Sequence, residues 1–423
     1  MRANIYTLLR RSEIYLKTDM VYLTKGGFWL GLAQIISSGS SFILSIVFAH
    51  FLTLEAYGNY KYVLSIAAIL SSFTLTGLGT SVTNGVSRGK EGVLQHAFKE
   101  ALKWSMPVVI TGVCVAEYYS YHNLQNIATA ILIATIATPI INSSSLFAAF
   151  LSGKKDFKTT TYYWSIINIF AVMCVVITTI ATRNFVYSAA AYFIGNAIGN
   201  LFFYYYTIKL FKPNKITDST AVNYGRHITI INLLNIFSSQ LDKVLLFHFL
   251  GPIQLAIYSF SIAVPDQIKA ILGAIPRLAH PKFANHNIAT IKQSITSKMI
   301  KMSVISLGIT FIYIIISPMI YEHLFPNYIA SIKYSQLIAL GLVAISGSLP
   351  LTALQAHGEK KLLYIHAFIL NGTRLLSMVV CIPLFGLTGA VIAILIGRFV
   401  SLITPTMLLL KIPDQRDGVQ KQN

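Results

Sequence analysis

The sequence predicts an all-α polytopic membrane protein with twelve transmembrane helices in two six-helix lobes around a central cavity. Of its 423 residues 55% are apolar and only 11% are charged, and the mean hydropathy is +0.64. Soluble domains carry about 25% charged residues, so this chain is too apolar for water. Apolar stretches of about 20 residues recur along the whole chain, which is the length that one bilayer crossing needs. Because an open sheet edge is not tolerated in lipid, these stretches are expected to be helices.

Twelve stretches are long enough to cross the bilayer. The expected spans are 27–52, 61–84, 102–122, 126–151, 160–182, 185–209, 226–250, 253–278, 299–321, 331–356, 361–384 and 387–411. They divide the chain into a cytoplasmic N-terminal segment (1–26), an N-terminal six-helix lobe (27–211), a cytoplasmic inter-lobe linker (212–225), a C-terminal six-helix lobe (226–411) and a cytoplasmic tail (412–423).

The basic residues give the orientation. Of the 33 lysines and arginines, 26 lie in the two termini and in every second loop, whereas the opposite loops hold only Lys61, Arg183 and Lys333. Cytoplasmic loops are the ones enriched in basic residues, so both termini are expected in the cytoplasm.

The two halves of the chain also resemble each other. HFLTLEAYGNY (50–60) matches HFLGPIQLAIY (248–258), and SGKK (152–155) occupies the place of HGEKK (357–361). An even number of spans per half gives both halves the same orientation, as in the parallel repeats of secondary transporters.

Several function classes are disfavoured by the sequence. The formal charge of +19 comes from short clusters between apolar stretches, and no nucleic-acid-binding motif accompanies it. Cys114, Cys174 and Cys381 all lie inside apolar stretches, which is typical of buried cysteines rather than of disulfides or metal ligands. The expected outer loops are short, and neither a catalytic cluster nor a phosphate-binding glycine loop is present. We therefore expect no enzyme, no metal site and no cofactor other than a coupling ion, H⁺ or Na⁺.

Three segments resemble the Wzx-type oligosaccharide flippases, the polysaccharide biosynthesis proteins of the multidrug/oligosaccharidyl-lipid/polysaccharide exporter superfamily. They are FLTLEAYGNY (51–60) leading to LTGLGTSVTNGVSR (75–88), LDKVLLFHFLG (241–251) and IPLFGLTGAVIA (382–393). The resemblance implies twelve spans in two lobes. It also implies translocation of an undecaprenyl-pyrophosphate-linked O-antigen or capsule repeat unit from the inner to the outer leaflet of a bacterial inner membrane. Other polysaccharide-assembly membrane proteins are possible partners.

Six charged residues lie inside expected spans of the C-terminal half: Asp242, Lys243, Asp266, Lys269, Arg374 and Arg398. Each costs about 2.5–3.5 kcal/mol at mid-membrane on insertion scales, so we expect them to face a water-filled cavity. Asp266 and Lys269 are three residues apart and can pair within one helix. Asp242 can pair with neighbours of Lys243 or with an arginine of another helix.

A purely structural ion network is one interpretation of these six residues. The other is a site for an anion, since cations exceed acids by two. On the second interpretation Lys243, Lys269, Arg374 and Arg398 bind the substrate diphosphate, because arginine offers a planar fork to phosphate oxygens and lysine a point charge. Asp242 and Asp266 are then candidates for binding the coupling ion.

Amide side chains of the first half are candidates for sugar contacts: Gln34, Asn142, Asn168, Asn196 and Asn200. The alternative is that they join helices by hydrogen bonds, as serine and asparagine commonly do in membranes. GNAIG (195–199) is a GxxxG pattern and predicts close helix packing rather than a site.

A multidrug exporter of the same superfamily fits the expected fold equally well. Its main difficulty is the excess of cations, because many exported drugs are themselves cations. A membrane-embedded polysaccharide polymerase or acyltransferase is a more distant alternative. The sequence leaves the glycan and the oligomeric state open.

Overall fold

The computed structural model describes residues 20–413 apart from 218, 274, 277–278, 280–282 and 285. Within these residues the chain is helical and contains no strand, which confirms the predicted all-α class. The predicted terminal segments 1–26 and 412–423 lie mostly outside the described residues.

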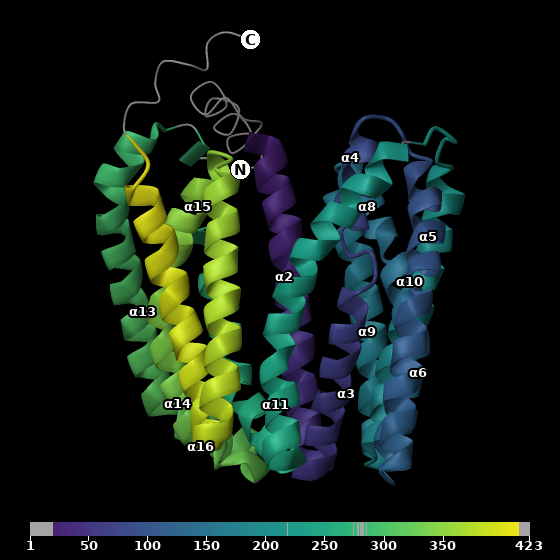
Figure 1. Cartoon of the computed structure of the whole chain (residues 1–423), viewed down its shortest axis with the longest axis vertical. Coiled ribbons are helices and arrows are strands. Elements are labelled where there is room, and N and C mark those ends of the chain that lie inside the picture. The colour runs from purple at the N-terminus through teal and green to yellow at the C-terminus, as the bar shows by residue number, and fades with distance from the viewer. Residues whose placement is uncertain are drawn as a thin grey trace, which may run out of the picture. The chain divides into compact units, whose positions relative to one another are not determined.

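The α-helices are α2 (Met20–Phe51), α3 (Leu54–Ser72), α4 (Leu78–Ser87), α5 (Val93–Trp104), α6 (Met106–Tyr121), α7 (Gln125–Ser144), α8 (Leu146–Gly153), α9 (Phe157–Thr182), α10 (Phe185–Phe211), α11 (Ser219–Leu272), α13 (Ile288–Leu324), α14 (Ser331–Leu340), α15 (Ser348–Ala356) and α16 (Lys360–Leu410) (Figure 1).

Seven helical stretches in the described part of the chain are long and apolar enough to cross a membrane. Asn232–Leu272 has 41 residues and Lys360–Leu410 has 51, about twice the roughly 20 residues of one crossing. Each contains a glycine with non-helical backbone, Gly251 at φ 81° and Gly386 at φ 57°. Positive φ is open to glycine at little cost. Both glycines lie in gaps predicted between consecutive spans, while the total of twelve crossings stays a prediction.

The predicted span 61–84 is broken in the structure. Helix α3 begins earlier, at Leu54, because the Thr53 hydroxyl caps it by accepting a hydrogen bond from the Ala56 N–H at 3.2 Å. It ends at Ser72, and α4 begins only at Leu78. The span 331–356 is interrupted as well, by the 3₁₀ helix η2 (Gly341–Gly347) between α14 and α15.

Side chains of neighbouring helices stabilise the break between α3 and α4. Asn142 Nδ2 donates to Thr74 Oγ1 at 3.0 Å, and Asn232 Nδ2 donates to Thr76 Oγ1 at 3.4 Å. The backbone N–H of Gly77 donates to Thr229 Oγ1 at 3.0 Å. Irregular backbone is tolerated at membrane depth only where protein groups satisfy it. Thr229 provides such a partner for the Gly77 N–H, and the two asparagines hold the threonine side chains of the break.

The described helices group into two compact units, one over Lys25–Ala256 and one beginning at Ile257. The boundary between the units lies inside α11, whereas the sequence places an inter-lobe linker at 212–225. A core of Val82, Leu94, Phe147 and Phe150 holds α4, α5 and α8 together in the first unit. In the second, Ile295, Leu349, Ala353 and Leu409 join α13, α15 and the end of α16. The predicted limits of the lobes stay predictions.

The internal sequence matches fall at corresponding turns. His50 is the last residue but one of α2, before the α2–α3 turn, and His248 precedes the break at Gly251 by three residues. SGKK spans the α8–α9 turn and HGEKK the α15–α16 turn. The recurrence of these turns supports the interpretation of the matches as a structural repeat.

Helices α9 and α10 pack closely, as GNAIG predicts. A Cβ atom on Gly195 would lie 3.3 Å from the Ala171 Cα atom, and one on Gly199 would lie 3.1 Å from Ile167 Cγ2. Small residues let two helices approach in a membrane. The packing interpretation of this motif is confirmed.

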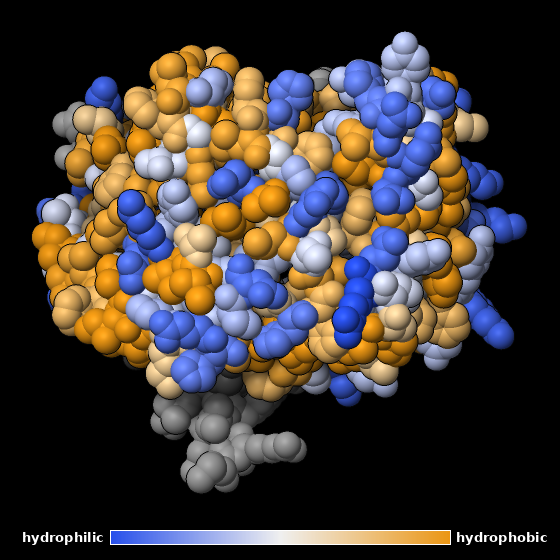
Figure 2. All heavy atoms as spheres, turned by 90° about the horizontal axis from the view of Figure 1, so that it is seen from below, coloured by the Kyte–Doolittle hydropathy of each residue, from blue (hydrophilic) through white to orange (hydrophobic). Residues whose placement is uncertain are grey.

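Large apolar side chains are exposed along the outer faces of several helices, which is expected of surfaces that contact lipid tails. On α13 they include Ile300, Val304, Leu307, Phe311 and Ile315. Hydrophilic residues are interspersed among hydrophobic ones on the face seen from below (Figure 2).

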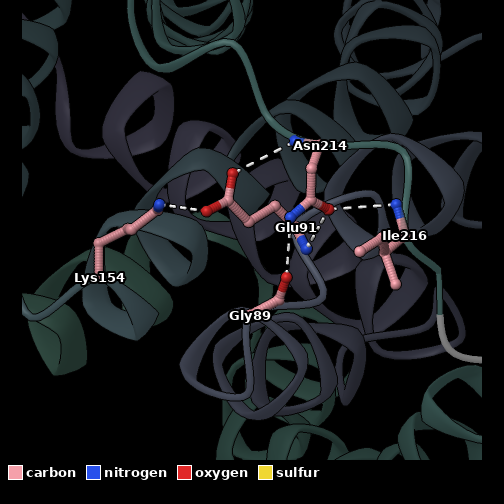
Figure 3. A network of polar contacts seen from close by, with 5 residues as sticks. All are labelled: Gly89, Glu91, Lys154, Asn214 and Ile216. Atoms are coloured by element: carbon pink, nitrogen blue, oxygen red, sulfur yellow. Dashed lines mark hydrogen bonds and ion pairs between the residues drawn. The ribbon is translucent and has the colours of Figure 1, made fainter.

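A polar network joins three connecting segments at one end of the first unit (Figure 3). Glu91 pairs with Lys154 through Oε1, and its Oε2 accepts from the Asn214 N–H at 3.3 Å. Asn214 Oδ1 accepts from the N–H groups of Glu91 and Ile216, and its Nδ2 donates to the Gly89 carbonyl at 2.8 Å. The segment that follows α10 is therefore fixed to the α4–α5 and α8–α9 turns.

Replacement of Asn214 by alanine should lower the free energy of unfolding by about 1–2 kcal/mol, because its three side-chain hydrogen bonds are lost at a partly exposed site. The apparent melting temperature of the purified chain in detergent measures this loss. Gln95→Ala, at an exposed position of α5, is the matched control and should melt as the parent does. Equal melting of both variants would contradict a stabilising role for the network.

The orientation predicted from the basic residues is tested by cysteine labelling in a cysteine-free background. Single cysteines at Lys99, Lys215 and Lys360 should react only after permeabilisation of spheroplasts, whereas a cysteine at Tyr121 should react in intact ones. All four positions are exposed. Labelling of Lys215→Cys from outside would refute the predicted topology.

Candidate functional site

Four charged side chains of the second unit form one group. Asp266 and Lys269 lie on α11, and Arg374 and Arg398 lie on α16. Lys269 interacts electrostatically with the other three, and Arg398 interacts with Asp266 and Arg374. The structure thus brings together four of the six intramembrane charges that the sequence singles out. Three cations and one acid leave an excess of two positive charges.

Arg398 is the most tightly held member of this group. Its Nη2 donates to Asp266 Oδ1 at 2.8 Å, and its Nη1 donates to the Ile338 carbonyl at 2.9 Å. The Arg398 side chain is 8% exposed, whereas that of Asp266 is 50% exposed. Asp266 therefore pairs with Arg398 and not with Lys269 of its own helix. The other part of its carboxylate is exposed.

The Ile338 carbonyl accepts two hydrogen bonds at the point where the helix geometry changes, one from the Gly341 N–H and one from Arg398. Helix α14 ends at Leu340 and continues as the 3₁₀ helix η2, in which hydrogen bonds run to the third residue rather than the fourth. Gly341 makes room for the arginine, since a Cβ atom there would lie 2.6 Å from Arg398 Cδ. The break in this helix and the position of Arg398 therefore depend on each other.

Lys269 and Arg374 are held differently. Neither side chain makes a hydrogen bond or an ion pair with any residue in the described ranges. Lys269 is exposed and Arg374 is half-buried. Arg374 lies against the second half of α16, where a Cβ atom on Gly397 would contact its Cγ at 3.8 Å. Two cations with unused donors beside a fixed arginine favour binding of an anion with several oxygen atoms.

The other two predicted charges belong to the first unit. Lys243 Nζ donates to Gln240 Oε1 at 2.8 Å, one helical turn away. The buried carboxylate of Asp242 accepts from the backbone N–H of Lys243 at 2.9 Å. Each of the two adjacent charges thus bonds to a polar group of its own helix.

Lys61 lies inside a helix and not in the outer loop that the sequence predicts. It is half-buried in α3, because Thr53 starts that helix seven residues earlier than expected. Its charge interacts with that of Lys243. A threonine followed by an acid in the first turn is a helix-start signal that could have revealed it.

The five candidate sugar-binding amides have different environments. Asn142 bonds to Thr74, Gln34 to Ser38 of its own helix, and Asn196 to the carbonyl of Tyr192. Asn168 and Asn200 each keep a buried Oδ1 atom without a hydrogen-bond partner among the described residues. Asn142 thus acts in helix packing here, and the sugar contacts stay a prediction. No group of residues suited to a metal ion occurs in the ranges that the structure describes.

The chain matches the model of a known protein family. The model of the polysaccharide biosynthesis protein family matches residues 23–280. The chain belongs to this family. The match covers the first unit and the start of the second, including Asp242, Lys243, Asp266 and Lys269, and it confirms the resemblance found in the sequence. None of the curated proteins with which the chain was compared is a match.

Solved structures show the fold to be that of MOP superfamily transporters. This polysaccharide biosynthesis protein is similar to a multidrug resistance MATE family transporter in an inward-facing conformation, with a TM-score of 0.65, 14% identity, and coverage of 88% of this chain and 94% of that one. The lipid II flippase MurJ gives a TM-score of 0.60 at 12% identity, with 90% and 87% covered. A MOP superfamily transporter from Pyrococcus furiosus, described by the reverse polarity of its binding pocket, gives 0.60 at 14%, with 91% and 95% covered. These relatives are transporters and a flippase rather than enzymes, in agreement with the expected multi-pass membrane protein.

Proposed function

We propose that this polysaccharide biosynthesis protein is a flippase. It translocates an undecaprenyl-pyrophosphate-linked oligosaccharide repeat unit, of O-antigen or capsule type, from the cytoplasmic to the periplasmic leaflet of a bacterial inner membrane by alternating access. The observation that carries this proposal is the group of Lys269, Arg374 and Arg398 with a single acid, Asp266. A diphosphate carries about two negative charges, which matches the excess of two cations. Family membership supports the class of substrate.

Lys269 and Arg374 would contact the diphosphate with their unused donors. Arg398, fixed by Asp266 and Ile338, would add the remaining N–H groups of its guanidinium. Lys243 is a further diphosphate ligand expected from the sequence. Lys61 adds a second positive charge that interacts with it. Asn168 and Asn200 have unused oxygen atoms for sugar hydroxyls, if transport exposes them.

Translocation in proteoliposomes tests the proposal directly. The purified chain should move a fluorescently labelled undecaprenyl-pyrophosphate oligosaccharide across the bilayer, so that a membrane-impermeant quencher reaches it. Protein-free liposomes and the Arg374→Ala variant are the controls. A multidrug exporter, which the similarity to a MATE transporter also allows, would instead raise drug resistance in a drug-sensitive strain and leave the labelled lipid unmoved.

Asp266 is our first candidate for the coupling ion, ahead of Asp242. Half of its side chain is exposed, and a proton or Na⁺ bound there would compete with Arg398, whereas Asp242 is buried. Asp266→Asn should therefore abolish the dependence of translocation on pH or Na⁺ and reduce its rate. Asp242→Asn, measured alongside, should retain that dependence. Unchanged ion dependence in Asp266→Asn would exclude Asp266 as the coupling residue.

A further inference from the structure

A groove of about 480 Å³ lies between α9 and α10 at the end of these helices nearest Lys154. Lys158 and Thr159 of the first turn of α9 stand at one end of it. Its remaining lining is aromatic or apolar: Tyr162, Tyr163, Phe202, Phe203, Tyr206 and Leu210. The groove therefore has a cationic end and an aromatic, apolar remainder. This arrangement is complementary to a lipid with an anionic headgroup and an apolar tail.

The aromatic lining is ordered by ring contacts. Tyr163 stacks on Phe203 with ring centroids 4.3 Å apart, and this pair forms the inner side of the groove. On α10, Phe202 and Tyr206 lie parallel, 6.1 Å apart with planes at 9°. Phe202 is 60% exposed and Tyr162 63%. Phe202 and Tyr162 thus form the exposed side of the groove, where lipid tails reach them.

Hydrogen-bond donors of the groove are unused. The hydroxyl groups of Tyr162, Tyr163 and Tyr206 make no hydrogen bond with any residue in the described part of the chain, and Lys158 makes no ion pair there. By contrast, Lys154 of the same basic cluster is paired with Glu91. Asp156, two residues before Lys158, caps α9: its Oδ1 accepts from the Thr159 N–H at 3.0 Å, and its charge interacts with Tyr163. One lysine without an ion pair and three phenols without a hydrogen bond in the described residues thus line a single groove.

We propose that this groove binds an acidic phospholipid of the surrounding bilayer, with its phosphate headgroup at Lys158 and the tyrosine hydroxyls and an acyl chain along Phe202. Basic and aromatic residues of this kind lie at the level of the headgroups in membrane proteins. An acidic headgroup fits because every free polar group of the lining can donate, and because the ammonium of a zwitterionic headgroup would be repelled by Lys158. The inference goes beyond the proposed flippase activity and does not depend on its substrate.

The full chain, purified in detergent and mixed with equal amounts of phosphatidylglycerol and phosphatidylcholine, tests the proposal by native mass spectrometry of retained lipid. The parent should retain phosphatidylglycerol preferentially. Lys158→Ala should weaken that retention about fivefold, since one basic residue near a membrane surface contributes about that factor. Tyr206→Phe should weaken it less, because it removes a hydroxyl and keeps the ring.

Two controls test whether the loss of lipid retention is specific to the groove. Lys99→Ala removes an exposed lysine of α5 outside the groove and should retain phosphatidylglycerol as the parent does. A phosphatidylglycerol with a photoreactive group near its headgroup should crosslink to peptides containing residues 157–163 or 202–210. Equal loss in Lys99→Ala and Lys158→Ala, or crosslinks confined to other helices, would overturn the proposal. Displacement of the lipid by inorganic phosphate alone would assign the site to a free anion instead.

Discussion

Arg398→Ala should abolish export of the lipid-linked glycan and also lower the amount of folded protein. The substitution removes the cation that pairs with Asp266 and one of the two hydrogen bonds to the Ile338 carbonyl, which keeps the bond from the Gly341 N–H. Breaking a fully buried ion pair from one side costs about 3–5 kcal/mol. Because half of the Asp266 side chain is exposed, we expect a smaller loss, about 1–2 kcal/mol. Surface glycan and membrane abundance, measured in a strain that lacks its own copy, report the two effects separately.

A double variant separates folding from substrate binding. Asp266→Ala combined with Arg398→Ala removes the unpaired acid and should restore most of the abundance without restoring export. Arg398→Lys should retain more export than alanine, since the charge remains while the planar fork is lost. Normal export by the double variant would eliminate Arg398 as a substrate ligand and leave it a purely structural role.

Arg374→Ala is expected to reduce export without affecting abundance. Its guanidinium has no hydrogen-bond or ion-pair partner in the part of the chain that the structure describes, so its removal breaks no polar contact there. A charge-assisted hydrogen bond to the diphosphate contributes roughly 1.5–3 kcal/mol, so its loss should weaken binding about tenfold to a hundredfold. Binding of an undecaprenyl-pyrophosphate oligosaccharide to the purified variant measures this change.

Lys269→Ala serves as the companion to Arg374→Ala. The Lys269 side chain has the same lack of hydrogen bonds and lies in the same electrostatic group. Its loss should also weaken binding, and loss of both should weaken it more than either alone. A loss of abundance in Arg374→Ala equal to that in Arg398→Ala would contradict the distinction between a fixed arginine and a free one.

The sequence identified the charged residues, and their pairing came from the structure. Asp266 and Lys269 are three residues apart, so helix geometry alone suggested that they pair. Arg398 instead reaches the carboxylate from 132 positions away, at 2.8 Å. No local pattern reports such a contact, because it requires α16 to pack beside α11 and Gly341 to leave room for the side chain.

Hydropathy determined the class of fold and the positions of two principal turns. Long apolar stretches must be helical in lipid, since every backbone polar group needs a partner, and Gly251 and Gly386 mark where long helices turn. The tertiary structure alone decided where helices break inside an apolar stretch. At the break after α3, the Gly77 N–H has Thr229 of another helix as its partner, and Asn142 and Asn232 bond to the hydroxyl groups of Thr74 and Thr76. The tertiary structure likewise places Arg398 beside the Ile338 carbonyl, which accepts from both the local Gly341 N–H and this side chain distant in sequence.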